Sequence, residues 1–400
     1  MAEWIECKIS DIGTVVGGAT PSTKKPENYE NGTIAWITPK DLSTFSGRYI
    51  QHGERNITEA GLRSCSTQLL PKNTVLFSSR APIGYVAIAA NDVCTNQGFK
   101  SVIPNENINP LFLYYLLKYN KDKIEGMGSG TTFKEVSGNT MKNIVVSVPK
   151  DMETQKQIVA VLGSIDDKIE LNNEINNNLL QQLNAIFKHW FTDNPQLDSM
   201  SQVPLADLCL VVTKGTTPTT LGKSFVSEGI NFIKAESILD SHAIDKNKFA
   251  FIDEETNDLL KRSIVCSGDI VFTIAGTLGR FAIIDDSVLP ANTNQAVAII
   301  RADSKKVMPQ YLYSFFLGNW HNDYYTKRIQ QAVQANLSLG TIKSLPIPVL
   351  SDKAMTEYLG IISPLITMTK TNELEISKLE ATRDALLPQL MSGQLDISEL

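Results

Sequence analysis

The sequence predicts an α+β fold in which two pseudo-symmetric domains are separated by two long antiparallel coiled-coil helices. Three observations predict this fold. Motifs of the first half recur in order in the second half, each long segment alternates short apolar runs with turns, and two acidic segments carry a heptad repeat. These observations place one domain at residues 1–150, a helix at 151–192, a second domain at 203–350 and a second helix at 351–392.

The duplication is visible as seven matches in the same order, at an offset that drifts only from 195 to 201 residues. Small changes of offset are what surface loops tolerate. The matches are Gly18-Ala19-Thr20-Pro21 with Gly215-Thr216-Thr217-Pro218, Ile34-Ala35-Trp36-Ile37 with Ile230-Asn231-Phe232-Ile233, Val75-Leu76-Phe77 with Ile270-Val271-Phe272, Ile83-Gly84 with Leu278-Gly279, Thr95-Asn96-Gln97 with Thr293-Asn294-Gln295, Pro110 with Pro309, and Ser137, Thr140 and Lys142 with Ser338, Thr341 and Lys343.

Within each domain, alternating apolar runs bounded by Gly, Pro, Asn and Asp predict strands, for example at 74–77, 85–89 and 144–148. Apolar stretches that follow a proline predict short helices at residues 110–119 and 309–317. Each domain is therefore expected to be of the α+β type.

The two acidic segments predict long helices because apolar and amide residues recur at alternating steps of four and three, which is a heptad seam. Pro364 predicts a late start or a kink in the second helix, and Pro388 predicts its end. The seam of the first helix is Ile158, Leu162, Ile165, Ile169, Asn172, Asn176, Leu179, Leu183, Ile186 and Trp190. The seam of the second, 200 positions later, is Tyr358, Ile362, Leu365, Thr369, Asn372, Ile376, Leu379, Arg383, Leu386 and Leu390.

The order domain, helix, domain, helix predicts antiparallel helices if the two halves are related by a closed two-fold axis. In an antiparallel pair, Asn176 is expected to face Asn372 and to fix the helix register. The alternative is that these amides lie at a solvated edge of the seam.

Composition excludes several classes of protein. Hydrophobic residues make up 42% and charged residues 20%, which excludes a disordered chain. No apolar stretch is long enough to span a bilayer, and the acidic N-terminus does not resemble a secretion signal. Five scattered cysteines without a C-x-x-C pair argue against disulfides and zinc, and indicate a cytoplasmic protein.

The net charge of -6 is unevenly distributed. Residues 1–150 hold 16 Lys and Arg against 13 Asp and Glu, and residues 201–350 hold 14 of each. Residues 151–200 and 351–400 are both acidic, at -5 and -4. The two domains are therefore neutral to mildly basic, which leaves nucleic-acid binding possible.

Enzyme signatures are incomplete in this sequence. Lys223 and Ser224 follow a glycine as in a phosphate-binding loop, but Thr217 stands where that loop needs its first glycine. Glu6-Cys7-Lys8 lacks the upstream Asp of a metal nuclease, and the four histidines form no H-x-x-x-H pair. These absences favour a non-catalytic binding module without cofactor or metal.

Several motifs resemble the DNA-specificity subunit of type I restriction–modification systems. They are the opening from Trp4 to Leu42 with its G-G-A-T-P-S and I-A-W-I-T-P-K-D-L runs, residues 76–84 with Asn96-Gln97, the V-P-x-x-x-x-x-Q-x-x-I-V-A-V-L-x-x-I-D run at 148–166, and the ending L-L-P-Q-L-M-S-G at 386–393. The second copy departs from the pattern, with Phe232 for Trp36 and Ala275-Gly276-Thr277 for Arg80-Ala81-Pro82. This departure puts in doubt that both copies use the same contact residues.

The resemblance implies two target-recognition domains, each reading one half of a bipartite, asymmetric site on double-stranded DNA through the major groove. It also implies that the helices form a spacer between the two domains and that two methyltransferase subunits bind the domains and helices. Motor–nuclease subunits would join this complex for cleavage. No membrane is implied.

Polar and cationic loop residues are the candidates for DNA contact, because base edges and phosphates are bound by such side chains. The alternative is that these loops are ordinary turns. Asn96 and Gln97 recur in the second copy, so they cannot discriminate two half-sites and are expected to bond the loop backbone or touch phosphate. The candidates are Lys24, Lys25, Ser78, Ser79, Arg80, Thr131 and Lys134 in the first domain, and Lys214, Lys223, Thr273, Arg280, Gln334 and Asn336 in the second.

Two rival functions remain open. A duplicated coiled-coil scaffold for protein interactions would explain the heptads and the negative charge without DNA. A hydrolase would need a nucleophile–base pair, and no histidine lies near the motifs that both copies share.

Overall fold

The computed structural model describes residues 3–130, 134–195, 197, 200–329, 337–395 and 397. The chain forms two compact units. Unit 1 comprises Met1–Asn173 and Leu374–Leu400, and unit 2 comprises Glu174–Glu373. Both long helices are divided at positions 200 residues apart, so each unit holds one β-rich domain and half of each helix.

Unit 1 holds three sheets, with strand orders β2-β9-β6-β7-β4, β5-β3-β8 and β1-β10. Apart from the parallel pairs β3–β8 and β4–β7, neighbouring strands are antiparallel. The strands are β1 (Trp4–Lys8), β2 (Gly13–Gly17), β3 (Ile34–Ile37), β4 (Tyr49–Ile50), β5 (Arg55–Ile57), β6 (Val75–Ser79), β7 (Ile83–Ala89), β8 (Cys94–Thr95), β9 (Lys100–Pro104) and β10 (Val145–Pro149).

Unit 2 repeats most of this topology, with strand orders β12-β19-β16-β17, β14-β13-β18-β15 and β11-β20; its sheets add β15, and β17 has no neighbour that corresponds to β4. Its strands β13 and β18 are parallel, as are their counterparts β3 and β8. The strands are β11 (Gln202–Pro204), β12 (Cys209–Lys214), β13 (Ile230–Ile233), β14 (Ala250–Ile252), β15 (Ile264–Val265), β16 (Ile270–Thr273), β17 (Phe281–Ile283), β18 (Ala291–Thr293), β19 (Val297–Ala302) and β20 (Pro346–Pro348). The duplication in sequence is therefore a duplication of fold.

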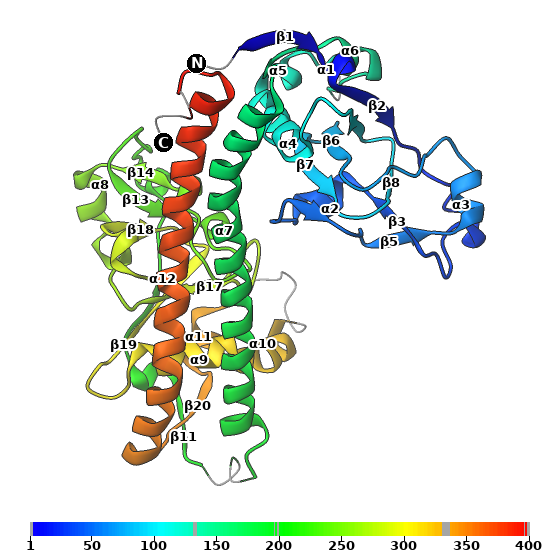
Figure 1. The fold of residues 1–400 in the computed structure, drawn as a ribbon. Helices are drawn as coiled ribbons and strands as arrows, with labels where there is room; N and C mark the ends of the chain where they lie inside the picture. The colour runs from blue at the N-terminus through cyan, green and yellow to red at the C-terminus, as the bar shows by residue number, and fades with distance from the viewer. Residues whose placement is uncertain are drawn as a thin grey trace. The chain divides into compact units, whose positions relative to one another are not determined.

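Short helices accompany the sheets, and two long helices follow the domains in sequence (Figure 1). The helices expected after Pro110 and Pro309 are confirmed as α4 and α9. In unit 1 the short helices are α1 (Ile9–Ile12), α2 (Pro39–Ser43), α3 (Glu59–Arg63), α4 (Pro110–Tyr119), α5 (Lys121–Gly126) and α6 (Gly138–Asn143). In unit 2 they are α8 (Glu254–Leu259), α9 (Pro309–Leu317), α10 (Trp320–Ile329) and α11 (Leu339–Lys343). The long helices are α7 (Met152–Phe187) and α12 (Asp352–Met391).

Local capping explains where several helices begin. The Asn109 side chain accepts hydrogen bonds from Leu111 N and Phe112 N at the start of α4, where Pro110 lacks an N–H. Ser137 caps α6 by accepting from Thr140 N at 3.0 Å, and Ser338 caps α11 by accepting from Thr341 N at 3.0 Å. The repeated Ser and Thr are therefore N-cap pairs.

The β-rich domain of unit 1 is fastened to its part of α7 by buried polar contacts. Arg48, which is 5% exposed, binds Glu170 through two of its nitrogens at 2.9 Å and also pairs with Asp167. Gln155 accepts from Asn109 N at 2.9 Å and donates to Pro149 O at 3.2 Å. These bonds hold the N-terminal half of α7, from Gln155 to Glu170, against the domain.

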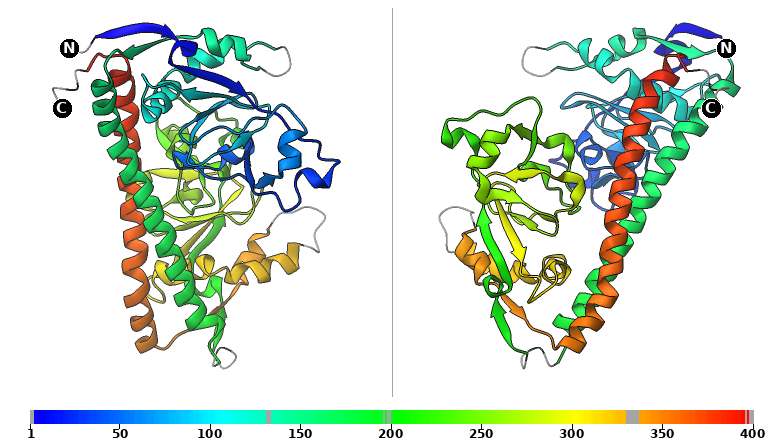
Figure 2. Two further views of the ribbon diagram at one scale, coloured as in Figure 1. Left: turned by 45° about the vertical axis from the view of Figure 1, so that its right-hand side comes forward. Right: turned by 90° about the vertical axis from the view of Figure 1, so that its left-hand side faces the viewer.

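The helices α7 and α12 run side by side in opposite directions, as the views in Figure 1 and Figure 2 agree. In unit 1, Arg383 Nη1 lies 2.9 Å from Asp166 Oδ1, and Asn172 Nδ2 lies 2.8 Å from Glu375 Oε2. From the first contact to the second, the residue number increases on α7 and decreases on α12. The two helices are therefore antiparallel, as expected from the sequence.

The polar pair at the seam lies within unit 2. Asn372 Nδ2 donates to Asn176 Oδ1 at 2.8 Å, and Asn176 Nδ2 lies 3.4 Å from Thr369 O. This is the pairing expected from the antiparallel arrangement, and Asn172 is bonded to Glu375 instead of an amide. The two amides satisfy each other rather than pointing to solvent.

All seam residues are buried or partly buried. Some of them join the main core of their own unit, namely Ile158, Leu162, Leu386 and Leu390 in unit 1 and Leu183, Ile186, Trp190, Tyr358, Ile362 and Leu365 in unit 2. In unit 1 the seam residues are Ile158, Leu162, Ile165, Ile169, Asn172, Ile376, Leu379, Arg383, Leu386 and Leu390, and in unit 2 they are Asn176, Leu179, Leu183, Ile186, Trp190, Tyr358, Ile362, Leu365, Thr369 and Asn372.

The late start expected from Pro364 was wrong, whereas the end expected at Pro388 lies within one turn of the observed end. Helix α12 begins at Asp352, before Pro364, and continues past Pro388 to Met391. Tyr358 and Ile362 are fully buried in the unit 2 core, and Leu390 and Met391 are buried in the unit 1 core. Packing of these side chains outweighs the cost of about 3 kcal/mol that proline brings to a helix interior.

Candidate nucleic-acid interface

A tight contact between two repeated motifs organises the loops of unit 1, and we call it the clasp. Ala19 N donates to Thr95 O at 3.0 Å, and the Thr20 hydroxyl donates to Gln97 Oε1. A Cβ on Gly18 would lie 2.2 Å from both Thr95 O and Asn96 O, so only glycine allows this approach.

The same clasp recurs in unit 2. Thr216 N donates to Thr293 O at 3.2 Å, and the Thr217 hydroxyl donates to Gln295 Oε1. A Cβ on Gly215 would lie 1.9 Å from Thr293 O. The residues that recur in both copies therefore build the loop support.

The repeated asparagines also bond loop backbone, as the sequence led us to expect. Asn96 Oδ1 accepts from Gly98 N at 2.9 Å, and Asn294 Oδ1 accepts from Ala296 N at 3.1 Å. Gly84 and Gly279 have φ of +101° and +87°, which is the turn geometry that glycine allows.

Three hydroxyls expected to contact DNA are instead buried and fully engaged, which corrects the expectation. Ser78 Oγ donates to Pro82 O at 2.8 Å and accepts from Tyr85 N at 2.8 Å. Ser79 Oγ donates to Gly98 O at 3.1 Å. Thr273 Oγ1 accepts from Arg280 N at 2.9 Å and donates within the same turn. All three are 0% exposed, because they tie the β6–β7 and β16–β17 turns together.

Two cationic side chains of unit 1, Arg80 and Lys100, contact the same carboxylate, that of Glu135. Arg80 Nη1 lies 3.6 Å from Glu135 Oε2, and Lys100 Nζ lies 3.3 Å from Glu135 Oε1. The Arg80 side chain is 35% exposed, whereas that of Lys100 is 14% exposed. Neither Lys100 nor Glu135 was a sequence candidate, since only the fold brings them to Arg80.

The remaining lysine candidates of unit 1 are Lys24, Lys25 and Lys134, and all three are exposed. Lys24 and Lys25 follow the clasp in the loop before β3. Thr131 lies outside the described residues. Their ammonium groups are exposed and, within the described part of the chain, form no ion pair that contact with phosphate would break.

The cations of unit 2 differ in their availability. Lys214 is exposed at the end of β12, directly before the clasp glycine. Arg280 is held by Asp240 through two hydrogen bonds of 2.7 and 2.6 Å, and these bonds lower the pKa of Asp240. Lys223 binds Glu255 at 2.7 Å, a hydrogen bond that raises the pKa of Lys223. Gln334 and Asn336 lie outside the described residues.

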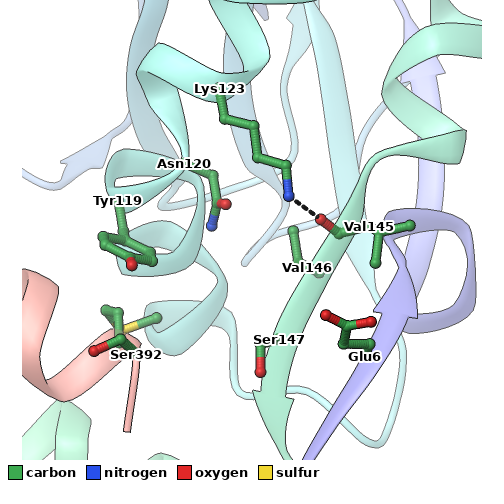
Figure 3. A pocket seen from close by; sticks show the side chains of 9 residues that line it. Glu6, Tyr119, Asn120, Lys123, Val145, Val146, Ser147 and Ser392 are labelled. Carbon is green, nitrogen blue, oxygen red and sulfur yellow. Dashed lines mark hydrogen bonds between the residues drawn. The ribbon is translucent and has the colours of Figure 1, made fainter. Parts of the chain in front are cut away.

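A pocket of about 420 Å³ opens in unit 1 (Figure 3). Lys123 Nζ donates to Val145 O at 2.7 Å, and Glu6 stands on the neighbouring strand. Its lining contains no histidine or cysteine. The lining is Glu6, Tyr119, Asn120, Lys123, Val145, Val146, Ser147, Met391 and Ser392.

The described residues contain no group of three or more His, Cys, Asp or Glu side chains arranged to hold a metal ion. No helix in that part of the chain is both long and apolar enough to cross a membrane.

Known proteins match this chain along its length. Residues 1–181 and 198–381 match the family model of the type I restriction modification DNA specificity domain. The type I restriction enzyme MjaIX specificity subunit of Methanocaldococcus jannaschii is 32% identical over 419 residues, covering 100% of this chain and 95% of the relative. The EcoR124I/EcoR124II specificity subunit of Escherichia coli is 30% identical over 184 residues, 44% of this chain and 43% of the relative.

A solved structure shares the fold. The crystal structure of a type I restriction–modification S subunit from M. genitalium aligns with a TM-score of 0.60 at 16% identity, covering 98% of this chain and 96% of that one. The chain therefore belongs to the family of type I restriction–modification DNA specificity subunits.

Proposed function

We propose that this chain reads a bipartite, asymmetric site on double-stranded DNA, with unit 1 recognising one half and unit 2 the other. The observation that carries the proposal is the repeated clasp with different side chains around it. A recognition scaffold must keep its support and vary its contact residues if two copies are to read different sequences.

The exposed lysines supply the phosphate contacts in this proposal, and the arginines supply base contacts. Lys24, Lys25 and Lys214 flank the clasps and are free to approach the backbone of the duplex. Among the described residues, the Arg80 side chain makes one long ion-pair contact, to Glu135, so it can turn its guanidinium toward a guanine edge at little cost. Arg280 must first break its ion pair with Asp240 before its guanidinium can contact a base.

The chain itself carries no catalytic role in this proposal. It directs adenine methylation by two bound methyltransferase subunits, and cleavage when motor–nuclease subunits join them in the cytoplasm. No cofactor is assigned to this chain.

The weak positive charge of the domains predicts that the partners contribute to affinity. Residues 1–150 carry a net +3 and residues 201–350 a net zero. Because sequence-independent affinity comes from neutralised phosphates, the lone chain should bind DNA weakly and gain sharply when methyltransferase subunits are added. Tight, specific binding by the lone chain at physiological salt contradicts this part of the proposal.

Methylome sequencing of a host with and without this chain tests the function. The proposal requires one bipartite adenine motif that disappears when the chain is deleted. A coiled-coil interaction scaffold without DNA specificity would leave every methylated motif in place.

A further inference from the structure

A buried ion pair joins the two long helices in unit 1. Arg383 Nη1 lies 2.9 Å from Asp166 Oδ1, and the two side chains are 16% and 6% exposed. The Tyr115 hydroxyl donates to Asp166 Oδ2 at 2.6 Å. In the described part of the chain, Arg383 is the only cation in ion-pair contact with Asp166.

The duplicated positions in unit 2 are apolar. Two hundred residues separate Asp166 from Ile366 and Leu183 from Arg383. Leu183 and Ile366 are each 5% exposed and belong to the same core cluster. The helix seam is thus ionic at one site and aliphatic at the site that the duplication makes equivalent.

We propose that the Asp166–Arg383 pair decides which helices pair, and that it excludes pairing of α7 with α7 from a second copy of this chain. Because the two helices derive from one ancestral helix, their seams are alike enough for like helices to pair. An asymmetric buried charge is a means by which coiled coils discriminate against such pairings.

The register of the native pair gives the consequence of a wrong pairing. Asp166 meets Arg383 in the native chain, so in an equivalent pair of two α7 helices it would meet Leu183 of the second copy. Both copies would then bury a carboxylate without its cation, which is strongly destabilising. Arg383 keeps its contact with Asp384, so Asp166 is the group that enforces the choice.

The order of synthesis makes this choice relevant. Helix α7 precedes unit 2's sheets and α12 in the chain, so its seam is exposed before its native partner exists. Apolar seams exposed in this way are prone to pair with another chain.

The test uses the full chain with a reporter cysteine, Ile175→Cys, which lies close to the midpoint of an α7–α7 pair in this register. The chain is unfolded, refolded at several concentrations, treated with a short bis-maleimide and analysed by mass spectrometry. A link between two reporter cysteines can only join two copies. The chain with no other change should give little of this product, and adding Asp166→Ile with Arg383→Leu, which copies unit 2, should raise it at least about tenfold.

A matched control changes only the lysine of the half-exposed pair Lys168–Glu375 to the corresponding residue of the other copy, as Lys168→Met, which keeps the bond between Glu375 and Asn172. This control should leave the reporter–reporter product at the level of the chain that carries Ile175→Cys alone. If the first variant does not fold, Asp166→Leu with Arg383→Met offers an apolar pair of different shape. A folded apolar variant that forms no more of this product than the chain with Ile175→Cys alone overturns the proposal.

Discussion

Alanine at Gly18 should open the clasp of unit 1. The added Cβ would lie 2.2 Å from Thr95 O and Asn96 O, more than 1 Å inside the ordinary contact range that begins near 3.4 Å. The obstructing atoms belong to the backbone and cannot rotate away. The segment after β2 that bears Ala19 must therefore move, and the hydrogen bond from Ala19 N to Thr95 O, 3.0 Å long, is lost.

The magnitude follows from two terms. Overpacking a tight contact costs about 1–3 kcal/mol. A lost internal hydrogen bond adds about 1 kcal/mol. The clasp should therefore open about 2–4 kcal/mol more easily, which corresponds to about 30- to 1,000-fold faster amide exchange.

Hydrogen–deuterium exchange of the peptide containing Ala19 measures this effect. Gly215→Ala should produce the same change at Thr216 in unit 2, because its Cβ would meet Thr293 O at 1.9 Å. Gly360→Ala is the control, since nothing lies within 4 Å of its Cβ and alanine favours a helix interior by about 1 kcal/mol. Wild-type exchange at Ala19 in Gly18→Ala would refute the reasoning.

Three further predictions concern the helices and two histidines. Replacing both Asn176 and Asn372 by Leu should loosen helix alignment, seen as a broader distance distribution between spin labels on the two helices of unit 2, and an unchanged distribution would show that the amides do not set the register. Inserting four residues in one helix adds about 6 Å, so the unspecified gap in the methylated motif should grow by about one or two base pairs, and an unaltered gap removes the idea that the helices measure distance. Burial lowers the pKa of both His242 and His321 to about 4. Between pH 6.5 and 4 the two histidines are therefore protonated in the unfolded chain but not in the folded one. The free energy of unfolding falls over this range, by about 1.4 kcal/mol per histidine at pH 5.5 compared with neutral pH. Urea unfolding should show this loss, and His321→Phe should remove about half of the histidine contribution; an equal loss in that variant would contradict it.

The architecture could be predicted because its signals are periodic. The heptad steps identified both long helices, and the antiparallel pairing of their seams identified Asn176 and Asn372 as partners. Propensity rules failed at Pro364, where the buried Tyr358 and Ile362 hold the preceding turns in place. Tertiary packing outweighs a local helix breaker there.

The candidate contacts were less predictable, because a loop residue's type does not show whether its polar group is already used. Ser78 and Thr273 occupy equivalent turns, and their hydroxyls are hydrogen-bonded to backbone groups. Arg280 forms an ion pair with Asp240, forty residues away in the sequence, and Arg80 lies in ion-pair contact with Glu135. No local pattern indicates such partners. Recurrence in both copies was more informative, because it led to the expectation that Asn96 bonds the loop backbone, and Asn96 does accept a hydrogen bond from Gly98 N.

The most direct measurement is the methylome of a host whose chain carries residues 203–350 in place of residues 1–150. If each domain reads one half of the target and the antiparallel helices relate the two halves by a two-fold axis, this duplicated chain should yield a palindromic bipartite motif built from the second half-site. Retention of the original asymmetric motif, or methylation at a motif with one part only, would contradict the assignment of one half-site to each domain.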